Sequence, residues 1–188
     1  MRHNLFSLAL VLFVSNTIIP SSFAEVLLEA GIHTGGDEIT LLDNSNTVIE
    51  STRAGSKYTL NIGGTKSFTD NVEAQFSLGI KSDASYSADK EASWVRYPLN
   101  AMLFYRTNKF RVGLGATAHF YPEFKVSGTT QNVSTKYEDA IGALFEIDYR
   151  LDSVFHLGLR YTDINYVSET NGQSFDGSSV GLLLIVLI

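Results

Sequence analysis

Apolar and polar residues alternate with a period of two along most of the chain, and this alternation recurs in eight segments. In the clearest segment, residues 72–81, Val72 and Phe76 fall on one face while Glu73 and Lys81 fall on the other. A period of two is typical of β-strands, because successive side chains point to opposite faces. The other segments are residues 26–33, 57–63, 94–105, 110–120, 141–149, 155–162 and 180–188, the last being apolar on both faces. The sequence therefore predicts an all-β protein of eight strands.

The first 24 residues have a different pattern, that of a cleaved export signal. A basic start at Arg2 precedes an apolar run from Leu5 to Val14, and Ser22 and Ala24 supply the small residues of a cleavage site. An uncleaved membrane anchor is the alternative, but a bilayer span needs about 20 apolar residues. We therefore expect residues 1–24 to be a signal peptide and residues 25–188 to form one mature domain.

The alternation does not say whether the apolar face lies inside a soluble barrel of the lipocalin kind or faces lipid. The lengths of the connections favour lipid. Segments near 65–71, 106–109 and 150–153 are short, whereas those near 34–55, 82–93, 122–136 and 163–178 are long and polar. Short turns at one rim and long loops at the other are typical of bacterial transmembrane barrels.

The aromatic residues and the composition of the polar face favour the same arrangement. Aromatic residues of the apolar face gather towards the two strand ends, and rings of this kind favour the membrane–water interface: Tyr105, Phe110, Tyr149 and Phe155 near the short turns, and Tyr58, Tyr97, Phe120 and Tyr161 near the long loops. The polar face mixes glycine with long charged residues, which suits a narrow lumen filled by side chains. The sequence thus predicts an eight-stranded antiparallel up-and-down transmembrane β-barrel.

Two sequence stretches, together with the eight-strand pattern, resemble a known family of proteins. Gly158-Leu159-Arg160-Tyr161-Thr162 and Gly177-Ser178-Ser179-Val180-Gly181-Leu182, within the eight-strand pattern, resemble the small OmpA/OmpX-type barrels of the Gram-negative outer membrane. The resemblance implies a monomer in the cell outer membrane, in contact with lipid and lipopolysaccharide, with long loops outside and both termini periplasmic. It also implies delivery by the outer-membrane assembly machinery. That machinery usually reads a terminal aromatic residue, whereas this chain ends in Ile188.

Composition and charge exclude several functions. The net charge of −6 provides no basic surface for a nucleic acid. The chain has no cysteine, so it has neither disulfides nor a thiolate metal site. Nothing in the sequence indicates a cofactor or a metal, and we predict none.

The polar face carries the residues that we expect to fill the lumen. Charges withdrawn from water are tolerated when they are paired and hydrogen-bonded. Four acidic and five basic residues, together with one histidine, therefore predict a structural polar network: Glu29, Glu73, Glu146, Asp148, Lys57, Lys81, Arg96, Arg111, Arg160 and His119. A gated polar path for small solutes is the functional alternative.

Three functions remain open for such a barrel. Its loops, with Tyr121-Pro122-Glu123-Phe124, Tyr86 and Tyr166, could bind a surface partner. It could instead be a narrow porin-like channel for small or hydrophobic solutes. Lipid A modification by a His–Ser pair is a third hypothesis, but neither His33 nor His119 has a serine two residues away. We therefore expect a non-enzymatic protein with a structural or surface-interacting role.

Overall fold

The computed structural model describes residues 25–42, 48–87, 90–128 and 132–188 of the chain, so the expected signal peptide lies outside the described residues. The described residues form thirteen strands: β1 (Glu25–Thr34), β2 (Glu38–Leu42), β3 (Val48–Arg53), β4 (Lys57–Ser67), β5 (Val72–Ser87), β6 (Lys90–Arg106), β7 (Phe110–Gly128), β8 (Asn132–Lys136), β9 (Ala140–Arg150), β10 (Phe155–Asp163), β11 (Asn165–Val167), β12 (Ser174–Asp176) and β13 (Ser179–Leu187). Within these ranges no helix has the length and apolar character needed to cross a membrane.

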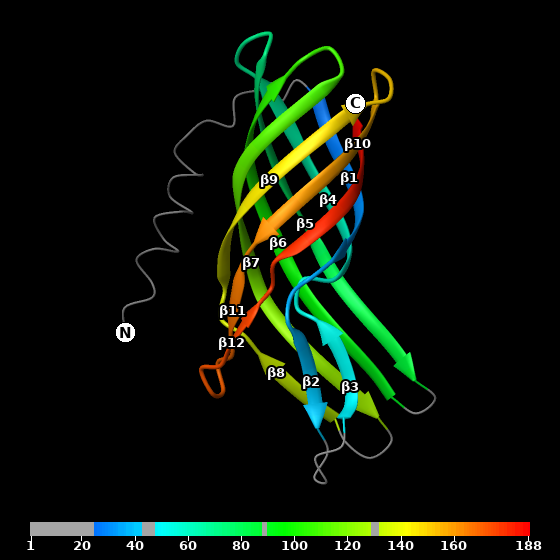
Figure 1. The fold of residues 1–188 in the computed structure, drawn as a ribbon, viewed down its shortest axis with the longest axis vertical. Helices are drawn as coiled ribbons and strands as arrows, with labels where there is room; N and C mark the ends of the chain where they lie inside the picture. Colours follow the sequence, from blue (N-terminus) through cyan, green and yellow to red (C-terminus); the bar gives the residue numbers. More distant parts are fainter. Residues whose placement is uncertain (1–24, 43–47, 88–89, 129–131) are drawn as a thin grey trace.

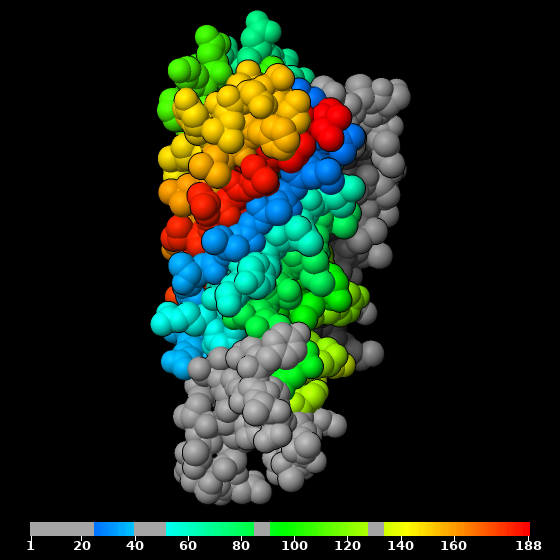
Figure 2. Space-filling view, turned by 90° about the vertical axis from the view of Figure 1, so that its right-hand side faces the viewer, coloured from blue at the N-terminus to red at the C-terminus, as the bar shows by residue number. Residues whose placement is uncertain are grey.

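Eight of the strands close into a barrel (Figure 1). They pair in the order β6–β5–β4–β1–β13–β10–β9–β7, and pairing of β6 with β7 completes the ring. All of these pairs are antiparallel. The predicted eight-stranded antiparallel barrel is confirmed. In a second view the wall is continuous, with β13, β1 and β4 running diagonally side by side (Figure 2).

The apolar face of each barrel strand points outward. Large apolar residues such as Leu60, Leu78 and Leu114 are 60–65% exposed, whereas neighbouring polar residues such as Gln75 and Glu146 are almost completely buried. Aromatic residues near both strand ends, among them Tyr105 and Tyr161, are also on the exposed face. Soluble proteins rarely expose such a continuous apolar surface. This distribution excludes the lipocalin-like alternative, in which the apolar face would fill the interior.

The two ends of the barrel differ. At the turn end, short connections join β4 to β5, β6 to β7 and β9 to β10. At the hairpin end, β5, β6 and β7 extend past the barrel, β8 pairs with β7, and β2–β3 and β11–β12 form hairpins (Figure 1). The sequence predicted long loops here. The structure has strands instead, because the alternation in β5, β6 and β7 continues beyond the predicted ends.

A bulge in β7 reverses which residues face inward. Val95 pairs with Glu123 while Tyr97 pairs with Phe120, so β7 has an extra residue at this point. Tyr121 has a φ of 50°, in the left-handed region that non-glycine residues seldom adopt. Before the bulge the even-numbered residues face outward, whereas after it Phe124 and Val126 face inward. The bulge therefore separates the pattern of the barrel wall from that of the hairpin end.

Candidate functional site

The middle of the lumen is occupied by an arginine between two glutamates. Arg160 on β10 donates from Nη1 and Nη2 to the two carboxylate oxygens of Glu29 on β1, at 2.7 and 2.6 Å, and from Nε to Glu146 on β9. Asn61 on β4 also donates to Glu29, at 2.5 Å. All four residues are buried. Arg160 forms a bidentate pair with Glu29 and a third bond to Glu146, so this cluster ties four strands together across the lumen.

A second cluster fills the turn end. Arg111 on β7 lies 3.1 Å from Glu73 on β5 and 3.1 Å from Asp148 on β9, and donates to Gln75 at 2.7 Å. Its guanidinium also stacks 4.2 Å from the centre of the Phe104 ring. At the rim, Arg106 donates to Glu73 at 3.1 Å. The two acidic and two basic residues balance, which makes this part of the lumen an electrically neutral plug.

The lumen towards the hairpin end contains cations with neutral partners. Lys81 on β5 donates to the Ser179 hydroxyl on β13 at 3.0 Å. Arg96 on β6 donates to the carbonyl oxygen of Ser56, and its guanidinium lies 5.2 Å from the Trp94 ring. Both cations are buried, and neither forms a salt bridge with any described residue.

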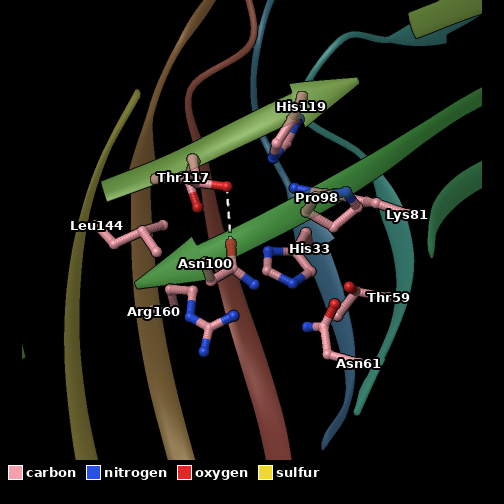
Figure 3. A pocket seen from close by; sticks show the side chains of 11 residues that line it. His33, Thr59, Asn61, Lys81, Pro98, Asn100, Thr117, His119, Leu144 and Arg160 are labelled. Carbon is pink, nitrogen blue, oxygen red and sulfur yellow. Dashed lines mark hydrogen bonds between the residues drawn. The ribbon is translucent and has the colours of Figure 1, made fainter. Parts of the chain in front are cut away.

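Two histidines lie beside these cations and line a small polar cavity (Figure 3). Nδ1 of His119 is 2.5 Å from the Tyr166 hydroxyl, and the two rings are tilted against each other. His33 faces the cavity, and neither of its ring nitrogens has a hydrogen-bond partner among the described residues. Thr117 donates to Asn100 at 2.7 Å on the opposite wall. The cavity has room for a water-sized group rather than for an organic substrate.

The structure places nine of the ten predicted lumen residues inside the barrel: Glu29, Glu73, Lys81, Arg96, Arg111, His119, Glu146, Asp148 and Arg160. Lys57 is the exception, because its side chain is exposed. It is the first residue of β4, where the inward-facing position opens to solvent, and its amine lies 5.5 Å from the centre of the Tyr58 ring. Lys57 is therefore not part of the network.

A hydrophobic core at the hairpin end, which we call the hairpin core, was not anticipated from the sequence. Its central residue is Trp94, which makes edge-on contacts with Phe124, Tyr137 and Tyr166 and donates to the Ala54 carbonyl at 3.0 Å. The complete cluster is Ile39, Ala54, Ala92, Trp94, Phe124, Val126, Tyr137, Ala140, Ile164 and Tyr166, with Phe175 packed against it.

This hairpin core corrects the predicted role of two aromatic residues. Phe124 and Tyr166 were expected to project from loops, but both are buried. The side chain of Tyr86 is outside the described set, while Tyr121 is 77% exposed. The alternation of Ala92 with Trp94 was the available signal, but the bulge at Tyr121 obscured the matching pattern in β7.

Main-chain bonds fix the hairpins around the hairpin core. The N–H of Asp37 donates to the Asp176 carbonyl at 2.7 Å, and the N–H of Asp176 donates to the Asp37 carboxylate at 2.9 Å. These bonds connect β2–β3 to β11–β12. The N–H of Glu138 donates to the Val167 carbonyl at 2.9 Å, which connects β11 to the segment after β8. The described hairpin end is thus a folded structure with its own core.

Among the described residues, no histidine forms the His–Ser pair that lipid A modification would require. His156 is buried at the turn end, with Nε2 3.4 Å from Nε of Arg150. His119 contacts a tyrosine hydroxyl instead of a serine. The part of the chain that the structure describes contains no group of three or more histidine, aspartate or glutamate side chains arranged to hold a metal ion.

Comparison with known proteins shows similarity in structure. No family model matches the chain, and no curated protein matches its sequence. The attachment invasion locus protein Ail of Yersinia pestis, solved in complex with the heparin analogue sucrose octasulfate, superposes with a TM-score of 0.54 at 11% identity, over 87% of this chain and 95% of that one. Neisserial surface protein A superposes with a TM-score of 0.53 at 13% identity, over 88% and 97% of the two chains. The chain therefore has the fold of the small eight-stranded outer-membrane β-barrels.

Proposed function

We propose that this protein is an integral outer-membrane barrel that presents the hairpin end as an interaction surface at the cell exterior. The observation that carries this proposal is the contrast between a lumen filled by side chains and a hairpin end built around its own core. The exposed apolar wall supports insertion into lipid, in contact with lipopolysaccharide. We further propose a monomer that is exported by the 1–24 signal peptide and inserted by the outer-membrane assembly machinery.

The filled lumen is the reason to prefer this role to a channel. Arg160 and Arg111 each span the lumen between two carboxylates, and eight strands leave an interior just wide enough for side chains. A conducting path would have to break both clusters. The cavity beside His33 and Lys81 has room for a water-sized group only. The narrow channel is therefore the second candidate.

The charge of the hairpin end indicates what kind of partner it suits. Residues 34–56, 83–93, 121–139 and 163–178 carry 13 acidic and 4 basic side chains. The similar protein Ail was solved with a polysulfated heparin analogue. A surface with this acidic excess repels polyanions and attracts cationic partners. We therefore propose a basic protein or peptide segment as the partner, in place of a sulfated glycan.

Localisation is tested first. The full chain, expressed in a Gram-negative host, is expected in the outer-membrane fraction, with an electrophoretic mobility in SDS that changes on boiling. Closed barrels resist SDS because no sheet edge is open. A protein that stays in the soluble periplasmic fraction, with no change on boiling, would refute the membrane assignment.

Binding is tested on purified barrel with polylysine and sucrose octasulfate as probes. Polylysine is expected to bind in a salt-sensitive manner, and sucrose octasulfate is not expected to bind. Neutralising Glu138 and Asp139, both exposed at the hairpin end, should weaken polylysine binding. The matched control is Asp70→Asn, at an exposed site of the turn end. Binding of sucrose octasulfate, or equal polylysine binding by all variants, would contradict the proposed surface.

The channel alternative has its own test. In planar bilayers we expect no stable single-channel currents from the wild-type barrel. Steady currents that increase when Arg160 is replaced would favour the channel and count against the filled lumen.

A further inference from the structure

Charge is distributed unevenly along the lumen. The central and turn-end clusters contain the four acidic residues that are buried in the described part of the chain, Glu29, Glu73, Glu146 and Asp148. Towards the hairpin end, Lys81 and Arg96 are buried, and their hydrogen-bond partners among the described residues are a hydroxyl and a carbonyl group. Burying a charge without a counter-charge is costly.

Among the described residues, one further carboxylate, that of Asp83, is close enough to affect this region, and it already accepts a hydrogen bond. Asp83 influences Arg96 electrostatically. It is only part-buried and accepts a hydrogen bond from Thr52 at 2.5 Å. It does not line the cavity beside Lys81. The positive charge at Lys81 therefore lacks a counter-charge where it meets the cavity.

Among the described residues, the cavity is lined mainly by hydrogen-bond donors and by no carboxylate, and the amide oxygen of Asn61 is an acceptor without a partner. Lys81, Arg160, His33 and His119 contribute cationic or imidazole groups, and threonine and asparagine side chains complete most of the lining (Figure 3). His33 is only 6% exposed, and both of its ring nitrogens are unpartnered among the described residues. A buried imidazole normally has a partner for its N–H. A group with acceptor character in the cavity would satisfy both His33 and Lys81.

We propose that this cavity binds a small monovalent anion, with chloride the expected occupant. Lys81 supplies the charge, and His33 supplies an N–H donor. The limited space excludes phosphate, sulfate and organic acids. The hairpin core lies on the hairpin-end side of the cavity and the Glu29–Arg160–Glu146 cluster lies on its turn-end side. We therefore expect the ion to act as a structural component that still equilibrates with the solution faster than the barrel unfolds.

The test is the rate of unfolding in SDS at different chloride concentrations. Ionic strength is kept constant with gluconate, which is too large for the cavity. If unfolding requires release of the ion, the unfolding rate is divided by the factor 1 + [Cl⁻]/Kd. A tenfold increase in chloride above the Kd therefore slows unfolding about tenfold. Lys81→Met should remove this dependence. Lys125→Met, at an exposed position of β7, should retain it.

A second measurement does not depend on the folding of a variant. Crystals of the wild-type barrel grown in bromide should give an anomalous peak between His33 and Lys81. An unfolding rate independent of chloride, or bromide-containing crystals without a peak in the cavity, would overturn the proposal. Chloride dependence that persists in Lys81→Met would also overturn it, because the ion would then be bound elsewhere.

Discussion

Replacement of Arg160 by methionine tests how strongly the lumen network stabilises the barrel. The side chain is 4% exposed, and the two carboxylates that it contacts are completely buried. In Arg160→Met, Glu29 retains the hydrogen bond from Asn61, but Glu146 loses its only side-chain donor among the described residues. Removing one partner from a buried ion pair costs about 3–5 kcal/mol, because the other charge remains buried. We expect a loss of that size in the free energy of unfolding.

The loss is measured by urea unfolding of the barrel in lipid vesicles, followed by tryptophan fluorescence and by mobility in SDS. Arg160→Lys keeps the charge but cannot form the bidentate contact, so it should lose less than the methionine variant. Lys109→Met, in an exposed turn, is the control for removing a positive charge and should change stability by less than about 0.5 kcal/mol.

A third variant distinguishes unpaired charge from lost packing. With Glu29 and Glu146 replaced by glutamine in the Arg160→Met background, no buried charge remains in the cluster. Stability should then recover in part, since neutral replacements of buried ion clusters are often well tolerated. If Arg160→Met were within about 1 kcal/mol of the wild type, or if the triple variant were less stable than the single one, the reasoning would be refuted.

Three further outcomes are expected. Gly113→Ala should destabilise the barrel by about 1–3 kcal/mol in urea unfolding, because the added methyl group would collide with the Phe104 ring. Trp94→Ala should make the hairpin end sensitive to added protease while the barrel keeps its boiling-dependent mobility. The carboxylate of Asp152 accepts two backbone N–H bonds, at 2.7 and 2.8 Å, which lower its pKa. An NMR titration should find this pKa below the ordinary value, and the stabilisation of the turn should be complete above the unfolded pKa and disappear as pH falls through the folded one.

The barrel wall could be predicted from sequence because its two environments differ so strongly. Phe76 and Gln75 are neighbours, yet one faces outward and the other is buried. Lipid on one side and a polar lumen on the other impose this contrast on each residue, so a period of two identifies strand and face together. Nine of the ten lumen residues were predictable for the same reason, since they are charged members of the inward face, whereas Lys57 is exposed at the start of β4.

The hairpin end could not be predicted in the same way. Beyond the barrel wall, the environments on the inner and outer faces of the strands both differ from the polar lumen and the lipid that flank the wall. The inward residues become apolar, as at Trp94 and Phe124, and the bulge at Tyr121 shifts the count by one. The sequence also could not predict which charged residues pair with one another. Which base meets Glu29 depends on strand tilt and stagger, which the alternation does not encode.

The composition of β13, the strand that closes the barrel, affects how its register with β1 is set. Leu183 and Ile185 make its inner face apolar, next to Leu27, and its outer face is apolar as well. Hydrophobicity alone therefore does not distinguish the native pairing with β1 from one slipped by a single residue. Gly181 makes that distinction, because the His33 ring occupies the space where a side chain at that position would lie. A slipped seam would place a leucine or valine against that ring, so the smallest residue of the last strand determines where the barrel closes.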